Sequence, residues 1–275
     1  MIYRALAELQ DRQEGGVLCT VVRSQGSTPR HAGSKMLVYA DGTIIGTVGG
    51  GELENRVRTV ALAALKDGQT RLLEYSMSDP ERGDPGICGG QVEVFVEPVL
   101  PKPLLVVIGG GHVGRTVVHL AHWLGFRVVV NDDRPEFCRP ESAPEADEFI
   151  YSSMSDLPAN LKITPWTYLV LTTRGSSVDV DGLPALLETL AAYIGVIGSR
   201  RRWATTRKAL EEKGVPREKL DRVVSPMGLE LNAETPEEIA VSILAEIISL
   251  RLGGHGRSMS LKEPHEAPQR ATTER

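Results

Sequence analysis

Residues 104–114 read Leu104-Leu105-Val106-Val107-Ile108-Gly109-Gly110-Gly111-His112-Val113-Gly114. Five consecutive apolar residues favour a strand that is buried on both faces of a sheet. The glycines that follow fit the pattern G-x-G-x-x-G, and residues 112–124 have the apolar period of a helix. In such a turn Gly109 and Gly111 let the backbone approach a pyrophosphate, and Gly114 allows the helix to pack closely on the strand. The stretch therefore predicts the first strand, turn and helix of a dinucleotide-binding unit.

An acidic pair stands where such a unit holds a ribose. The next apolar run, residues 127–130, leads into Asn131-Asp132-Asp133, close to the roughly 20-residue spacing expected after the glycines. Strand, turn, helix, strand and acid in this order predict a Rossmann fold. The candidate cofactor-binding residues of this region are Gly109, Gly111, His112, Gly114, Asp132 and Asp133.

The identity of the nucleotide, NAD or NADP, stays open. Arg134 follows the two acids directly and could equally favour an extra phosphate, so both NAD and NADP fit the pattern. His112 either faces the phosphates or is a plain residue of the first helical turn. The glycine turn could also be purely architectural.

Further apolar runs alternate with helical patterns behind residue 104. The runs at residues 168–172, 193–197 and 222–224 predict βαβ units and a parallel sheet. Thr235, Pro236 and Glu238 mark the start of the last helix with a capping box. We expect a Rossmann-like domain over residues 104–252 and a disordered polar tail over residues 253–275.

The front part of the chain has a different order of elements. A helix at residues 1–9 precedes a strand at 17–22, a hairpin with Asp41-Gly42 at its turn, a helix from about residue 52 to 65 and two more strands. Proline-rich residues 99–103 predict a stiff linker behind a domain over residues 1–98. The predicted fold class is α/β, with a C-terminal Rossmann-like parallel sheet domain preceded by a smaller α+β domain.

Two more polar loops follow strands of the predicted parallel sheet. They are Thr173-Arg174-Gly175-Ser176-Ser177-Val178-Asp179 and Gly198-Ser199-Arg200-Arg201-Arg202. Ligands bind at the carboxyl edge of such sheets, so Arg174, Ser199 and Arg200 are candidate cofactor-binding residues. Each could instead lie in a solvated loop or helix start. We find no convincing acid–base pair for hydride transfer in this domain.

Three glycine-containing turns mark the front domain. They read Gly26-Ser27-Thr28-Pro29-Arg30, Gly49-Gly50-Gly51 and Cys88-Gly89-Gly90. Glycine lets a ligand approach the backbone closely, and a thiol beside two glycines is placed where a ligand could reach it. The candidate cofactor-binding residues here are Ser27, Arg30, Gly49, Gly50, Gly51, Cys88, Gly89 and Gly90. The alternative is a set of sharp turns, with Glu52 and Glu54 favouring the start of a helix.

Composition excludes several classes. The 275 residues carry a formal net charge of -5, which gives no reason to expect nucleic acid or an anionic membrane surface as a partner. Residues 1–9 lack the uninterrupted apolar core of a secretory signal, and we expect no stretch long enough to span a bilayer. Cys19, Cys88 and Cys138 are three widely spaced cysteines, which exclude a full disulfide framework and a CxxC zinc site. We expect a cytoplasmic protein.

Taken together, the motifs resemble the XdhC/CoxI family of accessory factors for xanthine dehydrogenase and related molybdenum hydroxylases. The resemblance runs from about Val17 to Leu250. Besides the turns above it rests on the segments Asp132-Asp133-Arg134-Pro135-Glu136-Phe137, Tyr193-Ile194-Gly195-Val196-Ile197-Gly198-Ser199-Arg200-Arg201, Ser225-Pro226-Met227-Gly228-Leu229 and Glu234-Thr235-Pro236-Glu237-Glu238-Ile239-Ala240. Each segment alone is common, and their joint order is specific.

The resemblance implies a maturation factor without catalysis of its own. Such a protein binds molybdenum cofactor, as molybdopterin or its dinucleotide form, and protects it while a cysteine desulfurase supplies sulfur. It then inserts the cofactor into the apo-hydroxylase. Cys88 matches the family's cysteine associated with cofactor binding, and a soft thiolate suits a molybdenum ligand.

One position departs from the family pattern, which often has T-R-G-H, because Thr173-Arg174-Gly175 is followed here by Ser176. Serine cannot titrate near neutrality as histidine does, which puts an imidazole-dependent step at this position in doubt.

Two alternative functions also stay open: an NAD(P)-dependent oxidoreductase that uses the Rossmann domain, and a nucleotide-sensing scaffold. The sequence leaves a homodimer open as well.

Overall fold

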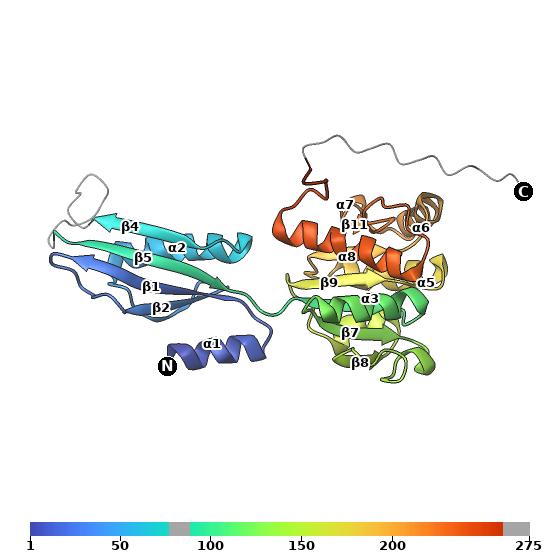
Figure 1. The fold of residues 1–275 in the computed structure, drawn as a ribbon, viewed down its shortest axis with the longest axis horizontal. Coiled ribbons are helices and arrows are strands. Elements are labelled where there is room, and N and C mark those ends of the chain that lie inside the picture. Colours follow the sequence, from blue (N-terminus) through green and yellow to red (C-terminus); the bar gives the residue numbers. More distant parts are fainter. Residues whose placement is uncertain (77–88, 261–275) are drawn as a thin grey trace, which may run out of the picture. The chain divides into compact units, whose positions relative to one another are not determined.

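The computed structural model describes residues 1–76 and 89–260, and the chain forms two compact units (Figure 1). The front unit comprises Met1–Lys102, and the Rossmann unit comprises Pro103–Arg275. The helices and strands of the front unit are α1 (Ile2–Asp11), β1 (Gly16–Gln25), β2 (Lys35–Tyr39), β3 (Ile44–Gly46), α2 (Gly51–Asp67), β4 (Arg71–Ser76) and β5 (Gln91–Val99).

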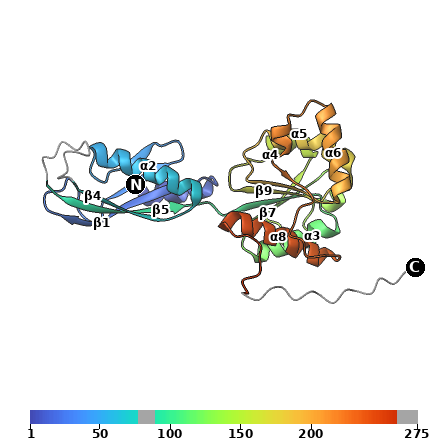
Figure 2. The same ribbon diagram turned by 90° about the horizontal axis from the view of Figure 1, so that it is seen from above.

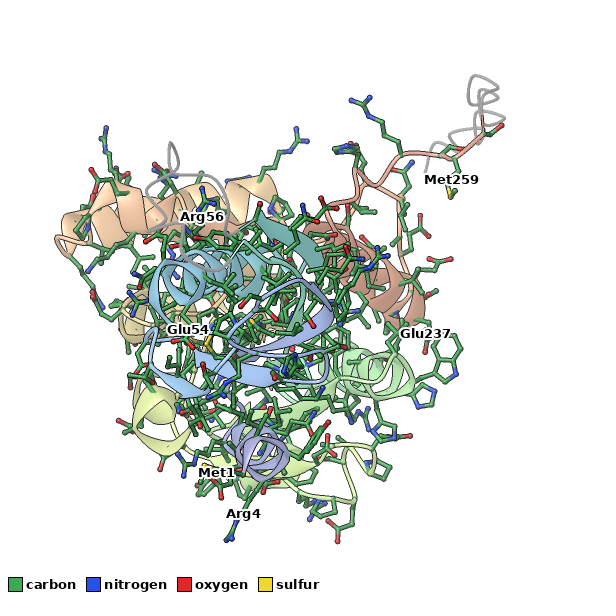
Figure 3. All side chains as sticks on the ribbon, turned by 90° about the vertical axis from the view of Figure 1, so that its left-hand side faces the viewer. Met1, Arg4, Glu54, Arg56, Glu237 and Met259 are labelled. Atoms are coloured by element: carbon green, nitrogen blue, oxygen red, sulfur yellow. The ribbon has the colours of Figure 1, made fainter. Side chains whose placement is uncertain are left out.

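In residues 1–76 and 89–102 the front unit is an antiparallel sheet with strand order β3-β2-β1-β5-β4 and one helix on each face. Alternate residues of a strand point to opposite faces. Met36 and Val38 accordingly pack with α2, whereas Leu37 between them packs with Leu9 of α1. Figure 3 shows Arg4 extending from α1 away from the sheet, where it pairs with Glu8 one helical turn later.

Pro98 lies inside β5 opposite Val17 of β1, and β5 ends at Val99, the first residue of the predicted linker. β4 pairs with β5 only at residues 91–96, so beyond Val96 β5 has a hydrogen-bonded neighbour on one side alone. A proline is tolerated at such an edge because its missing N–H faces no partner strand. The expected hairpin at Asp41-Gly42 is confirmed, and Gly42 has the positive φ of 82° that its turn needs.

The Rossmann unit alternates strands with helices. Its elements are β6 (Leu104–Ile108), α3 (His112–Trp123), β7 (Arg127–Asp132), β8 (Glu148–Tyr151), α4 (Leu157–Asn160), β9 (Thr167–Leu171), α5 (Ser176–Leu187), β10 (Tyr193–Val196), α6 (Arg200–Glu212), α7 (Arg217–Leu220), β11 (Val223–Val224) and α8 (Pro236–Leu252), with 3-10 turns at Pro135–Phe137 and Met154–Asp156.

Its six strands are all parallel, in the order β11-β10-β9-β6-β7-β8. The central strand β6 is buried on both faces. Leu105 and Val107 pack with α3 and α8, whereas Val106 and Ile108 pack with α4, α5 and α6 (Figure 2). The chain leaves β6 toward β7 on one side and returns at β9 on the other. This order is that of a doubly wound dinucleotide-binding sheet, with its switch point between β6 and β9, and the expected fold class is confirmed.

The end of the unit follows its sequence signals. Thr235 Oγ1 accepts the Glu238 N–H at 3.2 Å, and the Glu238 carboxylate accepts the Thr235 N–H at 3.1 Å, so the capping box of α8 is confirmed. Gly253 ends α8 in the left-handed conformation. No helix in residues 1–76 or 89–260 is long and apolar enough to cross a membrane.

Candidate functional site

The glycine turn of the Rossmann unit gives each motif glycine a separate role. Gly109 has φ +110°, and a Cβ there would lie 2.7 Å from the Thr172 carbonyl oxygen. A Cβ on Gly114 would overlap the Gly109 carbonyl oxygen, which is how α3 packs closely on β6. A Cβ on Gly111 would meet no described atom within 4 Å. Gly111 therefore leaves open space at the start of α3, where helix amides favour an anion.

The carboxylate of Asp132, at the end of β7, accepts hydrogen bonds from other groups of the protein. Its Oδ2 accepts the Gly110 N–H at 2.8 Å and the Arg134 Nη2–H at 2.9 Å. Its Oδ1 accepts the backbone N–H of Arg134 at 3.0 Å and the Nε–H of Arg134 at 2.9 Å. The residue is 4 % exposed, and the guanidinium of Arg134 stacks on the Phe137 ring at 4.0 Å. Asp132 therefore links the backbone of the glycine turn to Arg134 through hydrogen bonds to both.

Asp133 has a different partner and a different exposure. Arg174, from the loop after β9, donates from Nη1 to Oδ1 at 2.6 Å and from Nη2 to Oδ2 at 2.9 Å. The side chains of Asp133 and Arg174 are 41 % and 48 % exposed. The Arg174 hydrogen bonds lower the pKa of the Asp133 carboxyl below its usual range. This pair joins the ends of β7 and β9 beside the glycine turn.

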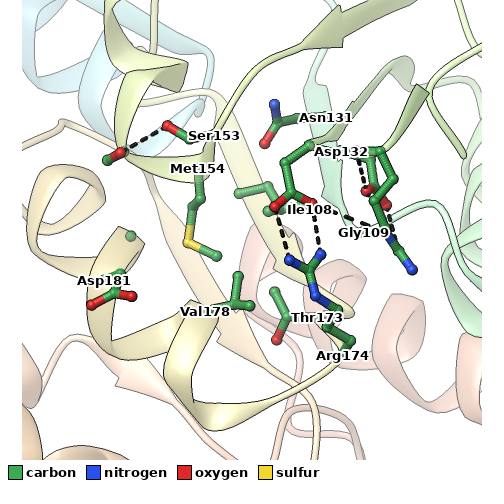
Figure 4. Close-up of a pocket in the computed structure, with 14 residues that line it drawn as sticks. Ile108, Gly109, Asn131, Asp132, Ser153, Met154, Thr173, Arg174, Val178 and Asp181 are labelled. Carbon is green, nitrogen blue, oxygen red and sulfur yellow. Dashed lines mark hydrogen bonds and ion pairs between the residues drawn. The ribbon is translucent and has the colours of Figure 1, made fainter.

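A pocket of about 180 Å³ lies at the carboxyl ends of these strands (Figure 4). Figure 4 shows Arg174 and Asp132 on one side of it and Met154 and Asp181 on the other. Its lining joins residues from the ends of β6, β7 and β9 to the turn after β8 and to α5: Ile108, Gly109, Asn131, Asp132, Asp133, Arg134, Ser153, Met154, Ser155, Thr173, Arg174, Val178, Asp181 and Gly182. A polar crevice at the switch point of a doubly wound sheet is where nucleotides bind.

A buried ion pair supports one wall of this pocket. Asp179 of α5 is 0 % exposed, and its Oδ2 accepts the Arg202 Nη2–H at 2.6 Å. Thr173 in the pocket wall donates to Asp179 and accepts from Arg202 at 2.9 Å. Sequence reasoning left Asp179 among loop residues, because its burial depends on α6, which lies more than 20 residues away. Ser176, at the position of the family histidine, begins α5.

The second polar loop leads to a separate cavity. Ser199 caps α6 by accepting the Arg202 N–H at 3.2 Å. Arg200 is exposed and lines a cavity of about 500 Å³ with Met227 and Leu229, beyond the ends of β10 and β11. His112 is exposed in the first turn of α3 and lines a third cavity instead, with Arg115 and His119. The structure therefore does not bring His112 and Arg200 into the pocket that holds Asp133.

In the front unit, the turns at Gly26–Arg30, Gly49–Gly51 and Gly89–Gly90 converge. Ser27 forms a parallel bridge with Gly89, and a Cβ on Gly90 would overlap the Ser27 carbonyl oxygen. A Cβ on Gly49 would lie 3.0 Å from Pro29 Cγ. Three segments that are far apart in the sequence therefore meet in one place. Ser27 and Arg30 are both exposed there.

The turn at Gly49–Gly51 is hydrogen-bonded to a carboxylate of the same chain, that of Glu54. Gly49, Gly50 and Gly51 have φ values of 149°, 80° and 58°, which residues other than glycine rarely adopt. Glu54 Oε1 accepts the Gly50 N–H at 3.0 Å and the hydroxyl of Thr47. A Cβ on Gly50 or Gly51 would meet no described atom within 4 Å. The turn thus binds one carboxylate and keeps backbone open to a second group.

Two of the three cysteines lie in the described part of the chain. Cys19 and Cys138 are free and buried, and burial raises the pKa of the Cys19 thiol to about 12. Burial also raises the pKa of the Cys138 thiol. Both are therefore poor nucleophiles near neutral pH. Cys88 lies outside the described residues. Among the described residues, no group of three or more His, Cys, Asp or Glu side chains is placed to hold a metal ion.

Some pocket residues carried no signal in the sequence. Ser153, Met154 and Ser155 follow β8, a four-residue strand that the apolar pattern did not reveal. Their position could have been found by expecting a third strand after β7, because a doubly wound sheet places one there.

Two family descriptions match separate parts of the chain. Residues 105–247 match the XdhC Rossmann domain, and residues 9–76 match the XdhC and CoxI family. One match lies in each of the two units.

Curated proteins of two bacteria are similar to the chain. The uncharacterized protein YqeB of Escherichia coli is 36 % identical over 266 residues, which are 96 % of this chain and 48 % of YqeB. The chain therefore spans about half the length of that relative. A protein of Bacillus subtilis, described as a probable subunit of xanthine dehydrogenase, is 27 % identical, with 90 % of this chain and 96 % of the relative covered. The molybdenum cofactor insertion chaperone PaoD of Escherichia coli is also 27 % identical, over 91 % and 88 % of the two chains.

A solved structure described as a xanthine dehydrogenase from Bacillus halodurans is similar as well. It has 26 % sequence identity and a TM-score of 0.49, and the match covers 90 % of this chain and 94 % of the other.

Proposed function

The chain belongs to the XdhC and CoxI family, and we propose that it is a molybdenum cofactor-binding maturation factor. In this proposal it protects the cofactor, supports its sulfuration and inserts it into an apo molybdenum hydroxylase such as xanthine dehydrogenase. The names of two relatives, which describe a cofactor insertion chaperone and part of a xanthine dehydrogenase, support this role. The chain itself is an accessory protein rather than a catalyst.

The observation that carries the proposal is the meeting of the three glycine turns in the front unit. Their contacts require glycine at Gly90, where any side chain would overlap the Ser27 backbone. A Cβ on Gly50 or Gly51 would meet no atom of the described residues within 4 Å, and in this proposal that space receives the ligand. A molybdenum cofactor has a flat pterin and a phosphate, and an open backbone edge with adjacent amides suits both groups.

Each side chain of this region has a distinct task in the proposal. Arg30 pairs with the anionic phosphate, and Ser27 hydrogen-bonds a polar edge of the pterin. Cys88, next to Gly89 in the sequence, supplies the soft thiolate that would hold molybdenum. The carboxylate of Glu54 at the Gly50 amide marks where this turn accepts negative charge.

The Rossmann unit binds a nucleotide in our proposal, either the nucleotide part of a dinucleotide cofactor or a separate NAD(P). Gly109, Gly111 and the start of α3 would hold the diphosphate. The pocket with Asp133 and Arg174 would hold the ribose. Arg200 lines the larger cavity and directly follows Ser199, which caps α6, and in this proposal both contact the far end of a long ligand.

A cysteine desulfurase and the apo-hydroxylase are the proposed partners, and homodimerisation is part of the same hypothesis. We place the protein in the cytoplasm, where a reducing environment keeps thiols such as Cys19 and Cys138 free.

Activation of an apo-hydroxylase tests the proposal. We expect Cys88→Ser to lower both cofactor retention and hydroxylase activation by at least roughly tenfold, because serine is a poor ligand for a soft metal. The measurements are molybdenum bound per chain and hydroxylase activity after incubation with apo-enzyme.

Cys138→Ser is the matched control, because it makes the same change at a buried thiol of the Rossmann unit. It should retain cofactor as the parent does. Equal retention and activation by Cys88→Ser would remove Cys88 from the site, and failure of the parent to bind cofactor would refute the proposed function.

A further inference from the structure

The pocket at the carboxyl edge of the Rossmann sheet contains a buried amide side chain with an unused hydrogen-bond acceptor. Asn131, which precedes Asp132 in β7, is 1 % exposed and lines this pocket. Its Nδ2 group donates to the carbonyl oxygens of Ile150 at 2.9 Å and Ser152 at 3.1 Å, and to the Ser152 hydroxyl at 3.1 Å. These acceptors fix the orientation of the amide, because the reverse orientation would set Oδ1 against two carbonyl oxygens.

The oxygen of this amide receives no hydrogen bond from residues 1–76 or 89–260. Buried polar side chains are normally hydrogen-bonded, because an acceptor without a donor is destabilising. Within the same ranges, the fully enclosed side-chain atoms without a partner are Arg202 Nε and Thr206 Oγ1. Since Asn131 Oδ1 is not one of them, it meets the open space of the pocket that Asn131 lines. A donor that enters the pocket would complete the hydrogen bonding of this side chain.

Asn131 and Asp132 point to opposite faces of the sheet, as successive residues of a strand do. Asp132 accepts the Gly110 N–H of the glycine turn. Asn131 shares the face of Val129, which packs with α4, α5 and α6. A ligand group that reaches Asn131 therefore lies on the α5 side of the sheet, away from the start of α3 where the proposed diphosphate binds.

The walls of the pocket near Asn131 are apolar. Ile108, Met154 and Val178 line it, and Figure 4 shows Met154 and Val178 below Asn131. Met154 can lie there because Gly182 has no side chain: a Cβ on Gly182 would lie 2.4 Å from the Met154 sulfur. The volume of about 180 Å³ suits one ring system rather than a whole dinucleotide. Apolar walls and a single amide oxygen favour a flat heterocycle that carries an N–H donor.

From this arrangement we propose that Asn131 Oδ1 accepts a hydrogen bond from an amino group on a flat heterocycle, and makes the pocket select amino-substituted rings over their carbonyl-substituted counterparts. A nucleobase such as adenine and the pterin of a molybdenum cofactor both carry such a group. The proposal rests on the ligand site that the proposed function assigns to the Rossmann unit, and it names the chemical group by which this site recognises its ligand.

Two matched pairs of probes test the amino group and distinguish its source. IDP differs from ADP, and lumazine from pterin, in one substituent, a carbonyl oxygen in place of the amino group. That oxygen would face Asn131 Oδ1 and leave two acceptors without a donor. In calorimetric titration of the full chain, we expect at least roughly tenfold tighter binding of the amino compound in the pair that binds. A preference for ADP over IDP would identify a nucleobase, and a preference for pterin over lumazine would identify a pterin.

Asn131→Ala removes the acceptor, so the two affinities of a pair should come within about twofold of each other. Asn160→Ala is the matched control, because it makes the same change at an exposed amide of α4 that donates to the Asp156 carbonyl oxygen at 2.9 Å and does not line the pocket. It should keep the ratio of the parent. Urea unfolding shows whether each variant is folded, and the ratio in the parent decides alone if Asn131→Ala does not fold.

Equal affinities of the parent for both members of each pair that binds would overturn the inference and leave Asn131 to an ordered water molecule. An unchanged ratio in folded Asn131→Ala would overturn it as well. Both results would leave the ligand site of the Rossmann unit standing. Binding of none of the four probes by the folded parent would overturn that site too, whereas cofactor retention through Cys88 is tested separately by Cys88→Ser.

Discussion

Replacement of Asp179 by alanine is expected to lower the free energy of unfolding of the Rossmann unit by about 3 kcal/mol. The carboxylate is fully buried, and its loss leaves the Arg202 guanidinium without its counter-ion and the Thr173 hydroxyl without its acceptor. Removing one partner of a buried pair costs more than the pair contributes, because the remaining charge stays desolvated. Since the side chain of Arg202 is 24 % exposed, we expect the lower end of the usual range.

Urea unfolding followed by tryptophan fluorescence measures this effect in one unit alone. All three tryptophans of the chain, Trp123, Trp166 and Trp203, belong to the Rossmann unit. Asp181→Ala is the control, since Asp181 lies two residues further along α5 in an exposed pair with Lys213. It should cost no more than about 0.5 kcal/mol. Equal stabilities of the two variants would show that the pair of Asp179 and Arg202 does not hold the pocket wall.

The second large effect is expected at Gly114. In Gly114→Ala the new methyl group would overlap the Gly109 carbonyl oxygen and lie 2.9 Å from Thr172 Oγ1. Both atoms lie just beyond the ends of the paired strands β6 and β9, where the Thr172 hydroxyl donates a hydrogen bond to the Gly109 carbonyl oxygen at 2.6 Å. α3 must therefore move away from the sheet. We expect a loss of about 2 to 3 kcal/mol of stability together with at least roughly tenfold weaker nucleotide binding.

Gly111→Ala separates the two consequences. A methyl group there meets no described atom within 4 Å, and the backbone has φ -68°, which alanine adopts without strain. Stability measured by urea unfolding should stay within about 0.5 kcal/mol of the parent. Nucleotide binding should still weaken, because the methyl group occupies the space that a diphosphate needs. Full stability in Gly114→Ala, or unchanged nucleotide binding in Gly111→Ala, would contradict these roles for the turn.

The sequence predicted the Rossmann unit well because its signals are local. The strand at residues 104–108, the glycine turn and the capping box at Thr235 each rest on neighbours within a few residues, and all three are confirmed. β8 was not predicted, because a four-residue strand has too few apolar positions to show the alternation typical of a strand. Val99 was assigned to a linker although it is the last residue of β5, because the end of β4, which leaves β5 with an open edge there, is not visible in the sequence.

The site could be predicted only in part, because it depends on contacts over long sequence distances. The pair Asp132-Asp133 was evident, but their different roles follow from Arg134 turning back onto Asp132 and from Arg174 approaching Asp133 from β9. Burial of Asp179 depends in the same way on Arg202 of α6. The three glycine turns of the front unit were each visible, whereas the bridge between Ser27 and Gly89 that joins two of them was not.

Mass spectrometry of the small molecules that copurify with the full chain tests the central claim, that this protein carries molybdenum cofactor. The chain is produced in cells that make the cofactor and is purified under reducing, oxygen-free conditions. Our account predicts a molybdopterin-derived pterin bound to the folded chain, with or without an attached nucleotide. A folded chain that retains only a nicotinamide dinucleotide, or no small molecule at all, would contradict it.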